Sequence, residues 1–571
     1  MKQKVAIFIA LLVFRMANAH FVQTFFQPDE YFQALEPAWQ IAFGPQSGAW
    51  ITWEWKEHLR TSVHPYLFAV AYRSMDWLCH ILQAGDHVRA NALGAAPRLI
   101  QAFCAASMDY LTWRIAGKVY GSRHAATRAA LAVTVCSPWQ WHCSVRTFSN
   151  SFETSLTAAA LYLFPWSMFL EVRDATGAHH RVSPTSLYIA LAAAATAFYL
   201  RPTNIIIWAT ISAVIVWHSR SFRKASILAQ AAAVAGSSVL AAFAAADRLY
   251  YKTWAIPPVH FLYLNLLQDL ATFYGQNRID YYFTEGLPLL LTTAFPFALL
   301  GLYQSFVAGQ SPKSTGQVIS FTFGAATVAT VLAFSAISHK EVRFIYPLLP
   351  ILHVLAARPL ASFFNIGAHS KARSVILVCG LAANVLIAYY VSLVHQRGVV
   401  DVMHYLRHRQ ESWIEAAAAG ELTEAVPANI SVGFLMPCHS TPWRSHFVYP
   451  EIEAWALTCE PPVNLSAEER LSYLDEADVF YADPVKWLDN NMQDRKIICD
   501  GHETATESSL EQLDVHRRQW PHYLVLFEQL IPTLQPLLAE TRYKECRRFF
   551  NTHWHDDHRR KGDVVVYCMR R

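Results

Sequence analysis

Long apolar segments separated by short polar stretches fill the first two-thirds of this chain. A membrane-spanning helix needs about 20 mostly apolar residues, and the pattern predicts about 10 to 13 such helices. Residues 1–398 are therefore expected to form a polytopic α-helical membrane region. The candidate spans lie at Val5–Val22, 64–84, 92–116, 125–145, 154–171, 185–200, 203–218, 225–246, 287–308, 317–337, 342–362 and 374–395.

The first apolar segment indicates how the chain enters the membrane. Lys2 and Lys4 precede it, and positively charged residues favour the cytosolic side of a membrane helix. The loop that follows, at about residues 23–63, is then expected in the lumen. A second interpretation stays open, because Ala17-Asn18-Ala19 resembles a signal-peptidase site. Arg15 interrupts the apolar core and favours a retained helix.

The pattern changes at about Gln396, where apolar runs shorten and charges and prolines become frequent. Residues 399–571 are therefore expected to form a water-exposed C-terminal domain of mixed α/β structure. Helices are predicted at 401–419 and 466–478, the second opened by a capping box from Ser466 to Glu469. The run Asp563–Cys568 predicts a strand.

The side of the membrane on which this domain lies is indicated by modification signals. Asn429 and Asn464 each begin a glycosylation sequon, as expected in the lumen. Disulfides are possible in that compartment. The number of cysteines in this domain is odd, so at least one stays unpaired or pairs elsewhere, and the pairing stays open. These cysteines are Cys438, Cys459, Cys499, Cys546 and Cys568.

Composition supports a membrane region joined to a polar domain. Hydrophobic residues make up 53% of the chain and charged residues 16%, whereas soluble domains contain about 25% charged residues. The mean hydropathy of +0.18 is low for a chain that is membrane throughout. The formal net charge of +4 does not suggest nucleic-acid binding. We predict no obligate protein partner.

An acidic pair, Asp29 and Glu30, follows the first apolar segment. Transfer of a sugar from a phosphate donor needs a base that deprotonates the acceptor hydroxyl, and a carboxylate near the membrane surface could supply it. A structural role is also compatible with the pattern, because Pro28-Asp29 is a good start for a helix, and the two roles do not exclude each other.

Cations that could hold a phosphate follow in the membrane region. His339, Lys340 and Arg343 lie together between two apolar runs, and Arg146 and Arg201 lie at the edges of others. Fixed positive charge stabilises a phosphate that leaves during transfer. Ordinary boundary cations that reach toward the membrane surface would give the same pattern.

The sequence contains little that indicates a metal or a nucleotide. The stretch His553–His558 has donor atoms that suit zinc or manganese, but no second ligand cluster accompanies it. A polar turn is the preferred interpretation, and no metal site is predicted. The chain has neither a Walker A loop nor an Asp-x-Asp element placed for a nucleotide sugar, which favours a lipid-phosphate donor.

Taken together, these motifs resemble the lumenal, dolichyl-phosphate-mannose-dependent α-mannosyltransferases that have the GT-C fold. The residues that carry the resemblance keep their order over the whole membrane region. They are Pro28–Tyr31, Trp53–Trp55, Arg60–Pro65, Arg146–Thr154, Arg201–Thr203 and His339–Phe344. In the tail, Met436–Trp443, Leu457–Pro462 and Phe549–Asp557 resemble the members that act in glycosylphosphatidylinositol (GPI) synthesis.

The resemblance implies an activity and roles for individual residues. It implies transfer of the third mannose, in α-1,2 linkage, from dolichyl phosphate mannose to a two-mannose GPI precursor in the endoplasmic reticulum, with inversion and without a metal or cofactor. Asp29 is the expected base and Glu30 its support. The donor phosphate is expected at His339, Lys340, Arg343 and Arg201. Other substrate contacts are expected at Arg60, His64, Arg146, Asn150, Asn265 and Tyr274.

One stretch departs from the family pattern. Asn277–Asp280 stands before Tyr281-Tyr282 where a His-Pro-Trp-like sequence is usual, and Glu285 stands where glutamine is common. These changes leave the details of that loop open. An N-glycan mannosyltransferase or the enzyme of the fourth GPI mannose is the alternative within the class. A polytopic transporter is a remote alternative, since no internal repeat is visible.

Overall fold

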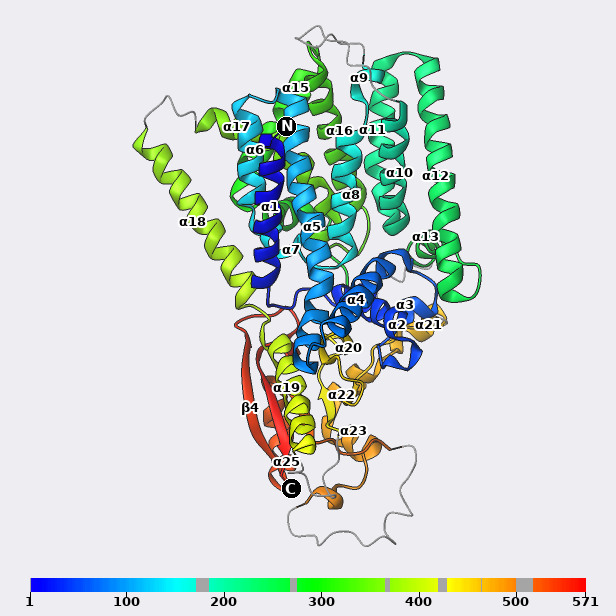
Figure 1. Cartoon of the computed structure of the whole chain (residues 1–571), viewed down its shortest axis with the longest axis vertical. Helices are drawn as coiled ribbons and strands as arrows, with labels where there is room; N and C mark the ends of the chain where they lie inside the picture. Colours follow the sequence, from blue (N-terminus) through cyan, green and yellow to red (C-terminus); the bar gives the residue numbers. More distant parts are fainter. Residues whose placement is uncertain are drawn as a thin grey trace. The chain divides into compact units, whose positions relative to one another are not determined.

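The computed structural model describes residues 2–170, 184–267, 275–364, 370–419, 429–463, 465–499 and 517–570. The chain divides into two compact units (Figure 1). Unit 1 comprises residues 1–22, 54–71 and 95–390, and unit 2 comprises residues 23–53, 72–94 and 391–571. The predicted boundary between residues 398 and 399 stays a prediction. The structure adds that the loop carrying Asp29 belongs to the same unit as the tail.

Unit 1 is a bundle of helices. Six described helical segments are long and apolar enough to cross a membrane, namely Lys2–Phe21, Phe222–Tyr251, Tyr282–Gly309, Thr315–Ser335, Val342–Phe363 and Lys371–Leu393. The predicted total of spans stays a prediction. The helices are α1 (Lys2–Phe21), α6 (Ala125–Val135), α7 (Pro138–Cys143), α8 (Ser149–Leu163), α9 (Trp166–Phe169), α10 (Pro184–Leu200), α11 (Ile205–Ser219), α12 (Phe222–Tyr251), α13 (Pro257–Leu262), α14 (Leu287–Leu291), α15 (Phe295–Gly309), α16 (Thr315–Ser335) and α17 (Leu349–Phe363). Among the described helices, four have residues in both units: α3 (Trp53–Lys56), α4 (Val63–Ile81), α5 (Asp86–Tyr120) and α18 (Lys371–Leu393).

Small residues bring the helices of this bundle close together. A side-chain carbon added at Gly301 would stand 2.1 Å from the carbonyl oxygen of Leu355, which joins α15 to α17. The same change at Gly316 would meet the carbonyl oxygen of Val119 at 2.0 Å. Close backbone approach at small residues is a common way to pack membrane helices, because water does not drive their association.

A buried ion pair fixes the first helix in unit 1. The Nε of Arg15 donates to Asp109 at 2.6 Å, and both side chains are fully buried. The same guanidinium donates to Asn18 at 2.9 Å, and Gln140 donates to the other oxygen of Asp109 at 3.0 Å. A charge in a membrane helix is tolerated where it has such partners. The arginine that interrupts the apolar pattern is therefore a packing contact of α1.

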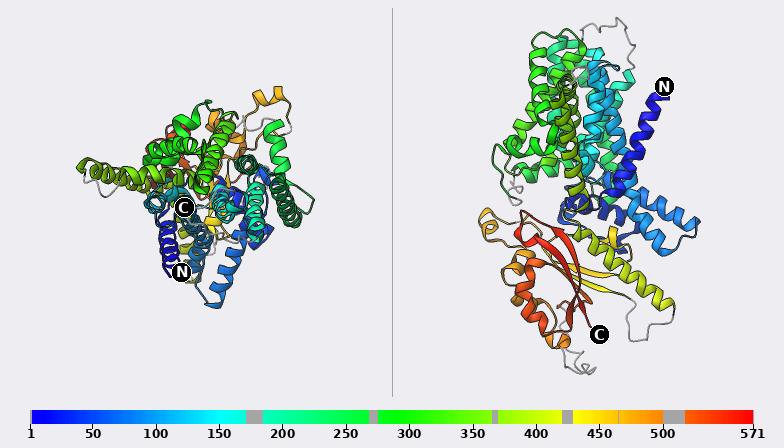
Figure 2. Two further views of the ribbon diagram at one scale, coloured as in Figure 1. Left: turned by 90° about the horizontal axis from the view of Figure 1, so that it is seen from above. Right: turned by 90° about the vertical axis from the view of Figure 1, so that its left-hand side faces the viewer.

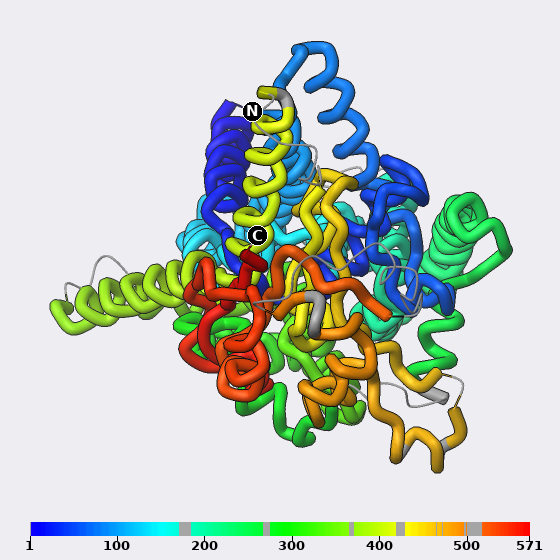
Figure 3. Tube along the Cα trace, turned by 90° about the horizontal axis from the view of Figure 1, so that it is seen from below, coloured from blue at the N-terminus to red at the C-terminus, as the bar shows by residue number. Residues whose placement is uncertain are grey.

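Unit 2 contains a five-stranded sheet in the order β2-β1-β3-β5-β4 (Figure 2). β1 runs parallel to β2 and β3, whereas β5 pairs antiparallel with β3 and β4. The strands are β1 (Ser431–Leu435), β2 (Glu453–Ala456), β3 (Tyr523–Phe527), β4 (Tyr543–Thr552) and β5 (Gly562–Met569). Figure 3 shows the chain trace from below, with the segments of β4 and β5 in red. The described helices of this unit are α2 (Glu36–Phe43), α19 (Gly398–Ala418), α20 (Arg444–Phe447), α21 (Ala467–Ser472), α22 (Glu476–Ala482), α23 (Pro484–Asn491) and α25 (Ile531–Ala539).

The local predictions for the tail are largely confirmed. Helix α19 and strand β5 cover the predicted segments, and the capping box from Ser466 to Glu469 is present. The prediction of one helix over 466–478 is wrong. Asp475 begins a second helix there, because its side chain accepts from the amide of Asp478 at 2.7 Å.

Four of the five tail cysteines form disulfides, Cys438–Cys459 and Cys546–Cys568. The second of these joins β4 to β5. Cys499 takes part in neither disulfide. The odd count is thereby explained within the described part of the tail.

Candidate active site

The acidic pair lies in unit 2 at the start of a helical segment. The segment begins at Asp29, continues as a single wide turn over Tyr31–Leu35 and leads into α2. The carbonyl of Pro28 accepts from the amides of Tyr31 and Phe32, both at 2.9 Å. The helix start expected at this position is therefore real. Glu30 is buried, at 3% exposure, whereas Asp29 is partly exposed.

A tail motif surrounds this helical segment. The ring of His439 lies 4.3 Å from that of Phe32 and 4.9 Å from that of Trp50, centroid to centroid. Trp50 also packs edge-on against Trp443 at 5.1 Å. The residues that suggest the GPI branch of the family thus contact the loop that carries the acidic pair. Nothing local in the sequence indicates this contact, because some 400 residues separate the two segments.

Glu36 connects the helical segment of the acidic pair to the tail through hydrogen bonds. The sequence did not predict this role. The Glu36 carboxylate accepts from the amide of Ser445 at 2.8 Å and from the amide of Trp50 at 3.1 Å. Burial raises the pKa of this carboxyl, and the hydrogen bonds from Ser445 and Trp50 only partly oppose the rise. Arg444 adds a bond to the carbonyl of Gly48 at 3.4 Å. The only signal in the sequence was an acidic residue inside an otherwise apolar stretch.

In unit 1, Glu341 is the shared partner of the side chains in the loop His339–Phe344, called the cationic loop below. Arg343 donates to this carboxylate with two nitrogens, at 2.6 and 2.7 Å, and Nε2 of His339 lies 3.1 Å away. Burial by itself would raise the pKa of Glu341, but Arg343 and His339 outweigh burial and hold it far below its usual range. The loop therefore holds an ionised carboxylate on which the Arg343 guanidinium and the His339 imidazole converge.

Lys340, in the same loop, bonds to Asn277. Its side chain is buried, and Nζ donates to the carbonyl oxygen of Asn277 at 3.1 Å. Its backbone amide donates to the side chain of Asn277 at 2.8 Å. Lys340 thus joins the loop to the stretch that departs from the family pattern.

Arg201 lies beside this loop. Its guanidinium carbon is 5.5 Å from the ring centre of Phe344, and that of Arg343 is 5.8 Å from the same ring. Glu153 lies 4.0 Å from Arg201 and accepts from the side chain of Asn204 at 2.7 Å. Asn150 lies 3.5 Å from the same carboxylate. Arg146, in contrast, is buried and donates to the carbonyl of His142 at 2.8 Å.

Arg60 and His64 also belong to unit 1, where their contacts are with other residues than those of the cationic loop. Arg60 pairs with Glu54 at 3.4 Å and covers the ring of Phe261 at 5.7 Å. Asn265 donates to the carbonyl of Phe261 at 2.9 Å. The imidazole of His64 stacks on Phe152 at 5.6 Å, and its buried Nε2 has no hydrogen-bond partner within the described residues.

The remaining predicted positions lie in the tail or outside the described residues. Tyr274 and Asn464 lie outside the described residues. Asn429 is partly buried and stands two residues before β1. The stretch His553–His558 follows β4, and Asp557 caps the short turn His558–Arg560 by accepting from the amide of Arg559.

Two clusters of metal-ligating residues occur among the residues that the structure describes. In the first, Cys438 and Cys459 form a disulfide beside His439 and so offer no thiolates. In the second, His87 and His408 contact Glu411 at 3.0 and 2.7 Å. The amide nitrogen of Asn91 lies 3.1 Å from Nε2 of His87, while its oxygen accepts from Arg407. This arrangement places the His87 proton on Nδ1, which suits a hydrogen bond to Glu411 rather than a metal.

Comparison with known proteins decides the family. The model of the Alg9-like mannosyltransferase family matches residues 6–448. The chain belongs to this family. GPI mannosyltransferase 3 of Aspergillus fumigatus is 44% identical to it, covering 99% of this chain and 77% of the relative. For GPI mannosyltransferase 3 of Yarrowia lipolytica the identity is 38%, with 99% and 97% covered. For GPI alpha-1,2-mannosyltransferase 3 of Bos taurus it is 30%, with 99% and 89% covered.

A solved structure agrees on the fold. ArnT from Cupriavidus metallidurans, bound to undecaprenyl phosphate, superposes with a TM-score of 0.52 at 13% identity, covering 99% of this chain and 97% of ArnT. The predicted GT-C fold, the membrane location and the membership of a mannosyltransferase family are thereby confirmed. The predicted roles of individual residues stay predictions.

Proposed function

We propose that this enzyme transfers the third mannose, in α-1,2 linkage, from dolichyl phosphate mannose to a two-mannose GPI precursor in the lumen of the endoplasmic reticulum. The observation that carries the proposal is similarity along nearly the whole length of both chains, as with the Yarrowia lipolytica relative. The tail supports the same branch of the family, because its motif residues contact the helical segment that begins with the acidic pair.

In the proposed reaction, Asp29 takes the proton from an acceptor mannose hydroxyl. The hydroxyl oxygen attacks the anomeric carbon of the donor as the bond from that carbon to the phosphate oxygen breaks. Dolichyl phosphate leaves from the opposite face, so a β-linked donor gives an α-linked product. The partial exposure of Asp29 suits a group that meets substrate, and the burial of Glu30 suits a supporting role.

The phosphate of the donor is proposed to bind at the cationic loop of unit 1. Arg343 and His339 converge on the Glu341 carboxylate, and Arg201 shares the ring of Phe344 with Arg343. The carboxylate of Glu341 shows that these side chains can hold an oxyanion. A phosphate presents similar oxygens to a guanidinium fork, and we propose that these cations stabilise the leaving group without a metal.

Complementation tests the proposal. The chain is expressed in cells that lack the third GPI mannosyltransferase, and surface GPI-anchored proteins and the two-mannose intermediate are measured. We expect surface display to return and the intermediate to disappear. A well-expressed chain that leaves the intermediate in place would contradict the assignment. Accumulation of a three-mannose intermediate would show that the third mannose has been added and that a later step of GPI synthesis is blocked.

A further inference from the structure

Two partly buried aromatic side chains, Trp50 and His439, lie together in unit 2 on the segment that carries the proposed base. Their ring centres are 4.9 Å apart. Both are partly exposed, whereas Phe32 and Trp443 behind them are buried, at 2% and 6% exposure. Buried rings fix the position of the exposed ones. The pair therefore presents a rigid surface with an apolar face and one polar ring edge.

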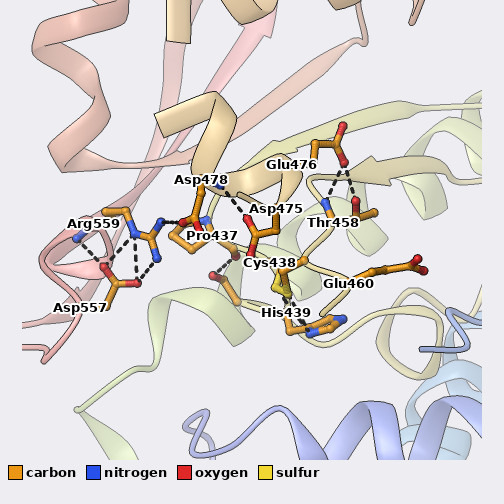
Figure 4. Close-up of a disulfide and its surroundings, with 12 residues drawn as sticks. Pro437, Cys438, His439, Thr458, Glu460, Asp475, Glu476, Asp478, Asp557 and Arg559 are labelled. Carbon is orange, nitrogen blue, oxygen red and sulfur yellow. Dashed lines mark hydrogen bonds and ion pairs between the residues drawn. A yellow bond between two sulfur atoms is a disulfide. The ribbon is translucent and has the colours of Figure 1, made fainter. Parts of the chain in front are cut away.

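The disulfide Cys438–Cys459 determines how His439 is held (Figure 4). Nδ1 of the imidazole lies 3.7 Å from the sulfur of Cys438 and 3.8 Å from that of Cys459. The backbone of His439 has φ of +54°, in the left-handed region that residues other than glycine rarely adopt. Strained backbone of this kind is concentrated at functional sites. Because Nδ1 faces the disulfide, the ring edge that carries Nε2 faces away from it.

The charge state of His439 suits a hydrogen bond with a neutral partner. Burial and the nearby Arg560 lower the pKa of this imidazole to about 4, although the charge of Asp29 acts in the opposite sense. The ring is therefore neutral at pH values near 7, with one nitrogen that donates and one that accepts. Asp29 stands three residues before Phe32, whose ring contacts that of His439 at 4.3 Å, so the proposed base belongs to the segment on which this imidazole packs.

We propose that Trp50 and His439 bind the terminal mannose of the acceptor. The apolar face of the sugar lies on the indole of Trp50, and Nε2 of His439 makes a hydrogen bond with a ring hydroxyl. This inference rests on the proposed function, because it takes Asp29 as the base. A base must touch the hydroxyl that attacks, so the groups beside it contact the acceptor rather than the donor phosphate.

Substitutions that spare the fold test the proposal. His439→Gly removes the imidazole at a backbone conformation that glycine adopts without strain, and His439→Asn keeps a polar group in a residue that tolerates this conformation. Trp50→Ala and Trp50→Phe leave the backbone bond to Glu36 in place, because the amide of Trp50 makes it. Trp77→Ala, at an exposed tryptophan of the same unit that lies outside the family motifs, is the matched control.

The assay uses solubilised full-length enzyme with dolichyl phosphate mannose and synthetic two-mannose glucosaminyl-phosphatidylinositol. We expect His439→Gly and Trp50→Ala to raise KM for the acceptor by about 3- to 10-fold, as for one lost neutral contact, and to leave KM for the donor unchanged. His439→Asn and Trp50→Phe should lie between these variants and wild type. Trp77→Ala should match wild type in both constants.

Each other outcome overturns the proposal in a distinguishable way. A merely structural role would lower kcat and leave both KM values unchanged. A rise in KM for dolichyl phosphate mannose alone would place the pair on the donor. If wild-type enzyme forms no product from the two-mannose acceptor, the proposed function fails and this inference with it. If wild type is active and the acceptor KM does not move in the variants, only this inference fails.

Discussion

Asp247 is the side chain whose replacement most sharply tests how the Arg60–Pro65 motif is positioned. One oxygen of its carboxylate accepts from the amide and the hydroxyl of Ser62, both at 2.7 Å, and from the hydroxyl of Thr61 at 3.1 Å. The other oxygen accepts from Tyr199 at 3.2 Å. Asp247 and Ser62 are fully buried. A single residue of α12 therefore holds the turn between Arg60 and His64.

The magnitude follows from the groups that lose a partner. Asp247→Ala removes the acceptor for a buried amide and for three hydroxyls. An unsatisfied buried polar group costs about 1–3 kcal/mol, and some hydroxyls can rotate to new acceptors. We therefore expect a loss of about 3–5 kcal/mol. In Asp247→Asn, the amide oxygen can replace the carboxylate oxygen that takes three bonds, and the amide nitrogen can donate to Tyr199. The expected loss is about 1 kcal/mol.

Thermal melting and kinetics in detergent micelles check this expectation. Asp247→Ala should melt well below wild type and lose activity, whereas Asp247→Asn should stay close to wild type in both. Ser62→Ala removes one of the four bonds and serves as an intermediate variant. Equal melting temperatures for Asp247→Ala and wild type would refute the positioning argument. An Asn variant as damaged as the Ala variant would show that the negative charge, and not the hydrogen bonds, matters.

Four further predictions concern the ion pair, the base, the metal and pH. Asp109→Leu should cost about 3–5 kcal/mol because it leaves Arg15 buried without a counter-charge, and Arg15→Leu with Asp109→Leu should restore most of it; a double variant as unstable as the single one would contradict this. Asp29→Asn should lower kcat by about 10²–10⁴-fold at an unchanged melting temperature, and near-normal turnover would exclude Asp29 as the base. Treatment with EDTA should leave activity intact, whereas loss that is reversed by added Mg²⁺ or Mn²⁺ would require a metal. Between pH 6.5 and 4 the unfolded chain binds a proton at His439 that the folded chain does not, so folded-state stability should fall as pH drops through this range; His439→Asn should show a shallower fall, and an identical pH profile would contradict the neutral buried imidazole.

The sequence by itself determined the class of this protein and the order of its motifs. Apolar segments of membrane length predict a helical membrane region because each backbone group in a bilayer must be satisfied within its own helix. Capping residues such as Ser466 act on neighbours three positions away, so a local pattern suffices to find them. The same local reasoning predicted α19 and β5.

Only the tertiary structure decided which distant residues meet. The charge of Glu36 in an apolar stretch and the place of His439 in a tail motif did not reveal their partners, yet these two residues connect the acidic segment to the tail motif. The break between α21 and α22 was missed because the apolar pattern continues past Asp475 and a cap takes precedence there. Contacts across hundreds of residues depend on packing that periodicity does not encode. The motifs therefore predicted the chemistry. Only the fold showed that Asp29 belongs to the same compact unit as the tail, which we propose helps to recognise the acceptor.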